Sequence, residues 1–267
     1  MYKWEADGDA KAVIVIVHGA MEHQGRYRWL VEMWRSAGYH VIMGDLPGQG
    51  LTTRSKRGHI NSFDEYIVEV KDWIQEAYEY HLPIFILGHS MGGLIAIRLL
   101  QEMEVNVAGL ILSSPCLGLV SYPSKTIHAA SAVLNFAYPS FKAATGITID
   151  MVTRDPEVRE SSSNDSLYII KVSVRWYHEL LTNVKEAFEN IPDLTDVPLL
   201  LMQAGDDKIV DKHSVKEWFN YTQCSEKAFK EWHGLYHEIF SEPEKEDVFY
   251  YAKGFVENAL RNLGYVV

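Results

Sequence analysis

The sequence predicts an α/β fold in which helices flank a doubly wound, mostly parallel sheet and a helical cap is inserted between two of its strands. Two observations predict this fold. Short apolar runs alternate with segments that carry apolar residues at helical spacing, which is typical of β-α-β units and a parallel sheet. The interval from 116 to about 193 departs from that alternation, which indicates the insertion.

The strands are predicted from short apolar runs, and the helices from the segments between them. The runs at 12–17, 40–43, 84–87, 107–112 and 197–202 are expected strands, and 229–232 is the probable last strand. Helices are expected over 27–37, 63–80, 90–103 and 243–263, with Pro243 suited to a first helical turn.

The interval 116–193 mixes aromatic residues with Ser and Thr and is predicted to be a mostly helical cap over one edge of the sheet, within a single domain spanning 1–267. Most of its aromatic residues are expected to form a small satellite core, and a few to line an acyl pocket. They are Tyr122, Phe136, Tyr138, Phe141, Trp176, Tyr177 and Phe188.

Composition excludes several classes of function. The chain has 267 residues, 47% of them hydrophobic, so it is long enough for one large core. Its net charge of −11 argues against nucleic-acid binding and gives no general attraction to anionic membranes. No basic leader or spanning apolar run is present, so a cytoplasmic protein is expected, with transient membrane contact through the cap as a further option. The oligomeric state stays open.

The two cysteines indicate neither a disulfide framework nor a metal site. Cys116 and Cys224 lie far apart and form no C-x-x-C pair, so both are expected to be ordinary thiols.

The segment Gly88-His89-Ser90-Met91-Gly92 has the pattern G-x-S-x-G and follows an apolar run. This pattern needs a strand that turns sharply into a helix and leaves the serine hydroxyl exposed on a strained backbone. Both the strand before it and the helix after it are predicted. Ser90 is therefore the expected nucleophile of an acyl-transfer reaction.

A serine nucleophile needs a base to accept its proton and a carboxylate to orient that base. The strand 197–202 runs into a turn with three acidic candidates, Asp206, Asp207 and Asp211, and spacing alone does not choose among them. His237 follows the probable last strand and is the expected base. The order Ser, Asp, His, each after a strand, favours it over His233, the nearest rival.

Two backbone amides are expected to stabilise the oxyanion of the tetrahedral intermediate. One is the amide of Met91, which follows the serine, and the other is that of Ala20, in the loop after the first strand. In that loop His18 and His23 lack a zinc-binding spacing and are expected to brace it. No phosphate loop or G-x-G-x-x-G opens a helix, so neither a metal nor a cofactor is predicted.

With these residues assembled, the chain resembles the monoacylglycerol lipase and lysophospholipase family of α/β hydrolases over nearly its whole length. The resemblance lies in five segments, which are 18–27 (HGAMEHQGRY), 57–59 with 62–63 (RGH and SF), 88–93 (GHSMGG), 207–211 (DKIVD) and 234–238 (GLYHE). It implies the α/β-hydrolase fold and makes Asp207 the catalytic acid. Gln49 departs from the family, which commonly has a histidine in this turn.

These observations predict a serine ester hydrolase that cleaves the fatty-acyl esters of phospholipids or lysophospholipids through Ser90, His237 and Asp207. A monoacylglycerol lipase or general carboxylesterase is the closest alternative. A non-catalytic lipid-binding module is a remote one, because such a protein would be expected to have lost a member of the triad.

Overall fold

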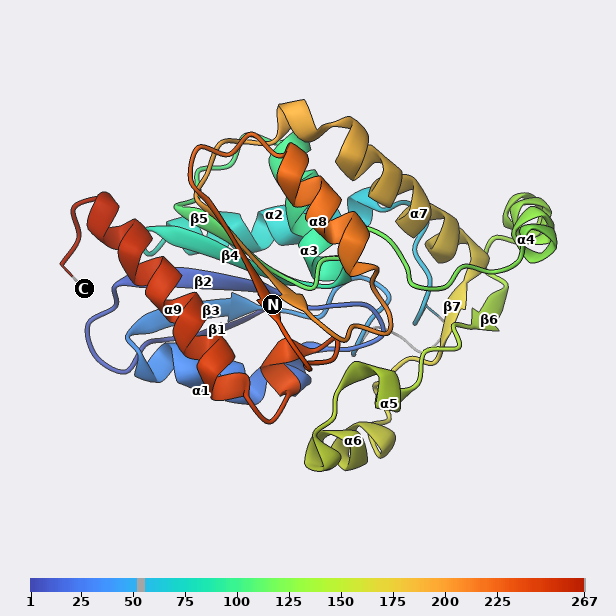
Figure 1. Cartoon of the computed structure of the whole chain (residues 1–267), viewed down its shortest axis with the longest axis horizontal. Coiled ribbons are helices and arrows are strands. Elements are labelled where there is room, and N and C mark those ends of the chain that lie inside the picture. The colour runs from blue at the N-terminus through green and yellow to red at the C-terminus, as the bar shows by residue number, and fades with distance from the viewer. Residues whose placement is uncertain (52–55, 267) are drawn as a thin grey trace.

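The computed structural model describes residues 1–51 and 56–266. A central sheet lies between two layers of helices, and a further group of helices extends from one side, as Figure 1 shows at the right of the view. The predicted α/β architecture is confirmed.

Within the part of the chain that the structure describes, the main sheet has seven strands in the order β1-β3-β2-β4-β5-β8-β9. Neighbouring strands are parallel except β1, which pairs antiparallel with β3 at one edge. The strands are β1 (Tyr2–Trp4), β2 (Ala12–Val17), β3 (Tyr39–Met43), β4 (Ile84–His89), β5 (Gly109–Ser113), β8 (Leu199–Ala204) and β9 (Lys227–Trp232). Strand β1 was not predicted, because three residues are too few to show an alternation of apolar and polar positions.

Helices flank both faces of the sheet. On one side lie α1 (Arg28–Ser36) and α9 (Lys245–Asn262), and on the other α2 (Asp64–Tyr78), α3 (Met91–Glu102) and α8 (Lys212–Tyr221). Short 3-10 turns are η1 (Gln24–Tyr27), η2 (Ile191–Asp193) and η3 (Ile239–Ser241). Pro243 does not begin the last helix as predicted; it lies two residues before α9, whose first turn instead contains Glu246 and Asp247. Those acids suit the positive end of the helix dipole.

Each face of the sheet buries its own hydrophobic core. Along β2, Val13, Val15 and Val17 belong to the core beneath α2 and α3, while Ile14 and Ile16 belong to the core beneath α1 and α9. Successive side chains of a strand point to opposite faces, so a strand buried on both sides is apolar throughout. This explains why the central strands appear in the sequence as continuous apolar runs.

We refer to residues 116–193, between β5 and β8, as the cap segment. It contains α4 (Lys125–Ala137), β6 (Lys142–Ala144), α5 (Ile149–Val152), α6 (Pro156–Ser163), β7 (Lys171–Ser173) and α7 (Val174–Glu189). Helix α7 packs on α3, whereas α4 contacts α7 and buries none of its residues. Besides its helices the segment has one antiparallel strand pair, β6 with β7.

The predicted satellite core of aromatic side chains is wrong for much of the cap segment. Phe136 on α4 is 93% exposed, and Tyr122, Tyr138 and Phe141 are also exposed. Trp176 on α7 is buried and donates a hydrogen bond from Nε1 to the hydroxyl of Tyr66 on α2. Because α4 projects away from the sheet (Figure 1), its aromatic residue has no second layer to pack against.

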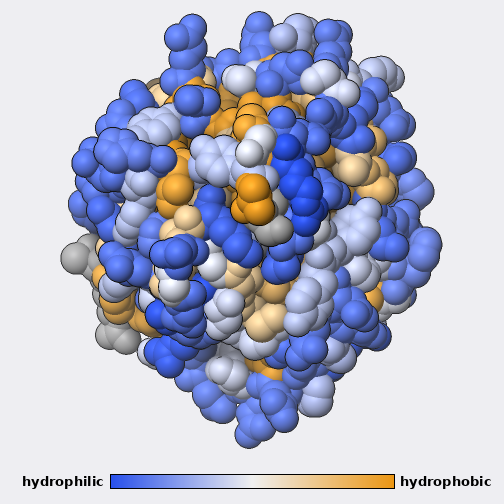
Figure 2. Space-filling view, turned by 90° about the vertical axis from the view of Figure 1, so that its left-hand side faces the viewer, coloured by the Kyte–Doolittle hydropathy of each residue, from blue (hydrophilic) through white to orange (hydrophobic). Residues whose placement is uncertain are grey.

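Figure 2 shows that the face turned away from the cap segment is mostly hydrophilic, with hydrophobic atoms gathered in small areas between charged and polar residues. Among the described residues, no helix combines the length and apolar character needed to cross a membrane.

Candidate active site

The candidate residues meet at one edge of the sheet because they follow parallel strands. Ala20 comes after β2, Ser90 after β4, Asp207 after β8 and His237 after β9. The carboxyl ends of parallel strands open on the same side of a sheet, where α/β proteins build their sites. Residues as far apart as 90 and 237 are thereby brought into contact.

Ser90 lies on a strained turn between β4 and α3. Its φ is 51° and its ψ is −118°, a conformation that residues with a side chain rarely adopt. The turn is tight because Gly92 packs directly on β2, where a Cβ would overlap the carbonyl oxygen of Val17. The backbone carbonyl of Ser90 accepts hydrogen bonds from Gly93 and Leu94, which starts α3.

The three predicted members of the triad form one chain of hydrogen bonds. The Oγ of Ser90 lies 2.8 Å from Nε2 of His237, and Nδ1 of the same ring lies 2.9 Å from Oδ2 of Asp207. All three side chains are buried or nearly so. With Nδ1 donating to the carboxylate, Nε2 is free to accept the serine proton, which is the arrangement of a general base.

Asp207 is held by four hydrogen bonds. Its Oδ1 accepts from the amides of Ile209 and Val210, both at 2.9 Å, and its Oδ2 accepts from Nε2 of Gln203 as well as from His237. The other two acidic candidates lie elsewhere. Asp206 is exposed, and Asp211 caps α8 by accepting from its first amides.

The electrostatics of the pair suit a base held by an ionised acid. Burial alone would raise the pKa of Asp207, but the adjacent His237 and the two loop amides lower it below its ordinary value. Burial alone would lower the pKa of His237, yet the carboxylate of Asp207 outweighs burial and raises it, with smaller contributions from Glu238 and Glu22.

Other histidines have different surroundings. The side chain of His233 is 87% exposed and faces Glu231, and His213 is exposed at the start of α8. His89 is buried beside the triad, with its ring centroid 4.9 Å from that of His237, but its Nδ1 contacts the carbonyl of Ser113. Burial lowers its pKa, so the ring is neutral at pH 7.

The loop after β2 places the first expected oxyanion donor beside the serine. Ala20 lines the cavity at Ser90, while Met91 is buried as the first residue of α3. Next to Ala20, Met21 has a positive φ of 68°, and its amide donates to Oε1 of the buried Gln49. The side chain that departs from the family pattern therefore holds this loop.

His18 and His23 join the same loop to its neighbours. His18 is fully buried and its Nε2 accepts from the amide of Leu46 in the turn after β3. His23 accepts from Gly25 through Nδ1, and its Nε2 lies 2.7 Å from Oδ2 of Asp165 in the cap segment. Within 1–51 and 56–266, no group of three His, Cys, Asp or Glu residues could hold a metal ion.

The cavity at Ser90 is lined by side chains that the sequence did not single out. Three come from the cap segment, namely Ile147, Val152 and Tyr168, and Ile209 comes from the loop after β8. None of the seven predicted aromatic residues is among its lining residues. Ile147, Tyr168 and Ile209 stand in loops and Val152 ends the four-residue helix α5, so no periodicity in the sequence distinguishes them from surface positions.

Two charged residues beside the triad were also missed as parts of the site. Arg26 and Glu238 occur in segments quoted for the resemblance, but charged residues in loops are ordinarily solvated. Their side chains are each only 10% exposed. The sequence signal that could have found Glu238 is its position directly after His237.

Sequence comparisons identify relatives along nearly the whole chain. The pattern of the family described as serine aminopeptidase, S33, matches residues 8–244. The chain is 57% identical over 258 residues to the protein of Bacillus subtilis (strain 168) named Phospholipase YtpA, covering 96% of this chain and 99% of that protein. It is 30% identical over 243 residues to Monoglyceride lipase of Homo sapiens, covering 90% and 79%.

Solved structures show the same likeness. The crystal structure of the Paleococcus ferrophilus monoacylglycerol lipase matches with a TM-score of 0.84 and 27% identity, covering 97% of this chain and 98% of that one. A soluble variant of the Saccharomyces cerevisiae monoglyceride lipase matches with a TM-score of 0.87; at 22% identity it shares the fold.

Proposed function

The chain belongs to the serine aminopeptidase, S33, family and has the α/β-hydrolase fold, and from this premise we propose that it is a serine ester hydrolase acting on phospholipids or lysophospholipids. One observation carries the proposal. The hydroxyl of Ser90 lies within hydrogen-bond distance of His237, which is itself hydrogen-bonded to the buried Asp207. This is the geometry that activates a serine.

The reaction proceeds in two halves. Ser90 Oγ attacks the acyl carbonyl while His237 takes its proton, and the amides of Ala20 and Met91 stabilise the oxyanion. His237 returns the proton to the departing alcohol as the ester bond breaks, which leaves an acyl-serine. Water then attacks the acyl-serine while His237 takes its proton, and His237 gives that proton to Ser90 Oγ as the acyl bond breaks and the fatty acid leaves.

The choice of substrate rests on the relatives. The 57% identity to a protein named as a phospholipase supports a phospholipid or lysophospholipid. The more distant relatives named monoglyceride lipase support the alternative, in which glycerol is the leaving alcohol. Both use the same acyl chemistry, so the triad does not discriminate between them.

Substrates of this class reside in membranes, and α4 supplies a surface that could meet them. Its exposed apolar side chains include Ile127 at 60%, Val133 at 70% and Phe136 at 93%. Insertion of such side chains into the interface removes apolar area from water and needs no attraction between charges. That suits a chain with a net charge of −11.

Membrane contact is tested by flotation with neutral phosphatidylcholine vesicles. Phe136→Ser should reduce the bound fraction, whereas Tyr250→Ser on α9, also at an exposed aromatic residue, should not. Equal binding of the two variants, or no binding by the unchanged protein, would remove α4 from this role.

The function is tested by time-resolved mass spectrometry with phosphatidylglycerol, its lyso form and monoacylglycerol at matched concentrations, alongside Ser90→Ala. Fatty-acid release from a phospholipid that disappears in the variant supports the proposal. Release from monoacylglycerol alone keeps the mechanism and favours the alternative. Release that persists in Ser90→Ala contradicts both.

A further inference from the structure

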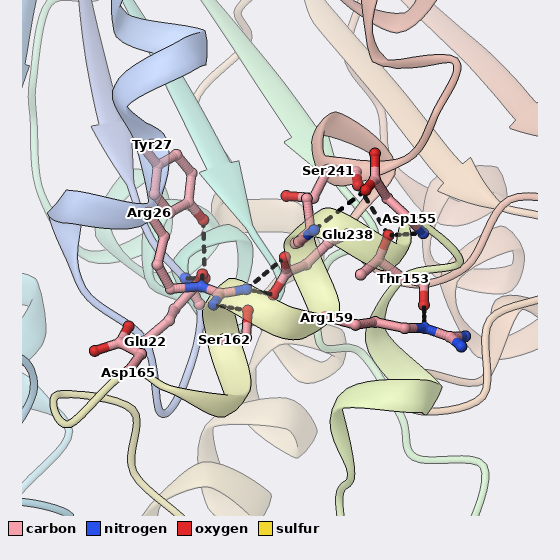
Figure 3. A network of polar contacts seen from close by, with 12 residues as sticks. Glu22, Arg26, Tyr27, Thr153, Asp155, Arg159, Ser162, Asp165, Glu238 and Ser241 are labelled. Carbon is pink, nitrogen blue, oxygen red and sulfur yellow. Dashed lines mark hydrogen bonds and ion pairs between the residues drawn. The ribbon is translucent and has the colours of Figure 1, made fainter.

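A buried cluster of charges lies beside the triad and takes no part in the reaction as described. It consists of Glu22 in the loop after β2, Arg26 on η1 and Glu238 directly after His237. Their side chains are 4%, 10% and 10% exposed. Figure 3 shows the three converging, with Arg26 between the two carboxylates.

Arg26 uses its whole guanidinium group. Nη2 donates to both carboxylate oxygens of Glu238, at 3.0 and 2.9 Å, and Nε donates to Glu22 at 3.4 Å. Nη1 donates to the hydroxyl of Ser162 on α6 of the cap segment. Both bonds to Glu238 come from one nitrogen, and it is the bonds of the other two nitrogens to Glu22 and Ser162 that fix the plane of the guanidinium group.

Each partner of Arg26 is in turn attached to a part of the candidate site. Oε1 of Glu22 accepts from the amide of Gly19, which precedes the expected oxyanion donor Ala20. The amide of Glu238 donates to the carbonyl of Val152 on α5, at 3.0 Å. One guanidinium thereby joins the oxyanion loop, the loop that carries His237 and the cap segment.

We propose that Glu238 is a positioning residue that, through Arg26, holds the His237 loop in register with the oxyanion loop and the cap segment. The inference rests on the proposed function, since it concerns the same base. Glu238 lines the same cavity as Ser90, and in this role it acts through its bonds with Arg26. It positions the loop that carries His237 and adds negative charge near the imidazole ring.

The cluster also affects the charge of His237. The groups that face this ring are the carboxylates of Asp207, Glu238 and Glu22, with the neutral His89 beside it and Arg26 between the last two carboxylates. Asp207 is the main cause of the raised pKa, and Glu238 adds to it. Removal of Glu238 and removal of Arg26 should therefore shift the pKa of His237 in opposite directions.

The test compares Glu238→Gln with Arg26→Gln through pH profiles of kcat/KM on p-nitrophenyl butyrate. Loss of the carboxylate should move the acid limb to lower pH, because the imidazolium loses a nearby negative charge. Loss of the guanidinium should move it to higher pH, because two carboxylates are left unbalanced. We expect kcat to fall about tenfold in Glu238→Gln, with KM within about twofold, as for a base held slightly out of place.

A purely structural role predicts another outcome. Breaking a buried ion pair lowers stability whichever partner is removed, and would reduce the active fraction without moving the pH profile. The proposal would be overturned if the acid limb moved in neither variant, or in the same direction in both. The matched control for charge is Glu217→Gln, at an exposed position on α8, which should leave the profile unchanged.

The link to the cap segment is tested without altering any charge. Ser162→Ala removes the hydroxyl that accepts from Arg26, and Ser163→Ala removes an exposed hydroxyl one residue further along α6. We expect Ser162→Ala, and not Ser163→Ala, to slow the labelling of Ser90 by a fluorophosphonate about threefold or more. Equal labelling rates would overturn the link. This variant also keeps the proposal testable if Arg26→Gln does not fold.

Failure of the inference differs from failure of the proposed function. If the unchanged protein does not hydrolyse esters, or Ser90→Ala retains its activity, the function itself is wrong. If the unchanged protein is active, Ser90→Ala is not, and the Glu238 and Ser162 variants behave as their controls do, only the inference is wrong.

Discussion

Replacing Asp207 with Asn should disable the base while leaving the fold nearly intact. Oδ1 of Asp207 accepts from the amides of Ile209 and Val210, and the Asn oxygen can take over both bonds. The Asn amide nitrogen must then replace Oδ2, which accepts from His237 and from Gln203. Two acceptor contacts therefore become donor contacts.

The consequence for His237 is a change of tautomer. Facing an N–H donor, its Nδ1 must become the acceptor, and the ring proton moves to Nε2, 2.8 Å from the hydroxyl of Ser90. A protonated Nε2 cannot accept the serine proton. An isosteric exchange of this kind in a serine protease triad costs about 10⁴-fold in rate, or about 5.4 kcal/mol at 1.36 kcal/mol per factor of ten.

The loss of stability should be much smaller. Gln203 can turn its amide so that Oε1 accepts from the new Asn, which gives up the 3.1 Å bond from Nε2 to the carbonyl of Ala204. One neutral hydrogen bond contributes about 1 kcal/mol. The predicted signature of Asp207→Asn is thus a large kinetic loss with a small change in the free energy of unfolding.

The assay is kcat/KM for p-nitrophenyl butyrate at pH 8, together with urea unfolding followed by tryptophan fluorescence. Asp211→Asn, at a cap of α8 outside the triad, is the matched control and should retain its rate. A rate for Asp207→Asn within tenfold of the unchanged protein would refute the reasoning. A loss of activity that is fully explained by unfolding would refute it equally.

Three further predictions follow from the geometry. Ser90→Ala should lower the rate by at least about 10⁴-fold with folding preserved, and activity retained in a clean preparation would exclude Ser90 as the nucleophile. The kcat/KM of the unchanged protein should rise with pH through an inflection above 6.5, the ordinary pKa of histidine, because Asp207 raises the pKa of His237 against the effect of burial. A flat profile from pH 5 to 9 would contradict this. Gly92→Ala should cost about 3 kcal/mol, because its Cβ would meet the backbone carbonyls of β2, and an unchanged urea midpoint would count against it.

Several features of this protein were readable in the sequence because they depend on neighbouring residues. Apolar runs predicted β2, β3, β4, β5 and β8, since a strand buried on both faces has few polar positions. The elbow was recognisable because a strained serine between close-packed elements needs glycine at 88 and 92. The order of nucleophile, acid and base along the chain indicated where the partners of Ser90 should be sought.

The choice among neighbouring candidates depended on the tertiary structure. Asp206, Asp207 and Asp211 stand within six residues, and residue spacing alone did not separate them. Only Asp207 is placed to accept from His237, because the turn after β8 directs two amides at its other oxygen. The resemblance had already favoured the same residue on different grounds.

Burial was likewise decided by packing between distant segments. Arg26 meets Ser162 across 136 residues and Glu238 across 212 residues, and nothing local to either position indicates a buried ion pair. Phe136 shows the reverse, since an apolar residue at helical spacing is expected to be covered and here is exposed on α4. The sequence alone indicated the buried strands of the sheet and the serine elbow, because periodicity and turn geometry act over a few residues. The tertiary structure decided which charges are buried together and which apolar face is left uncovered, because both depend on segments that meet only in the folded chain.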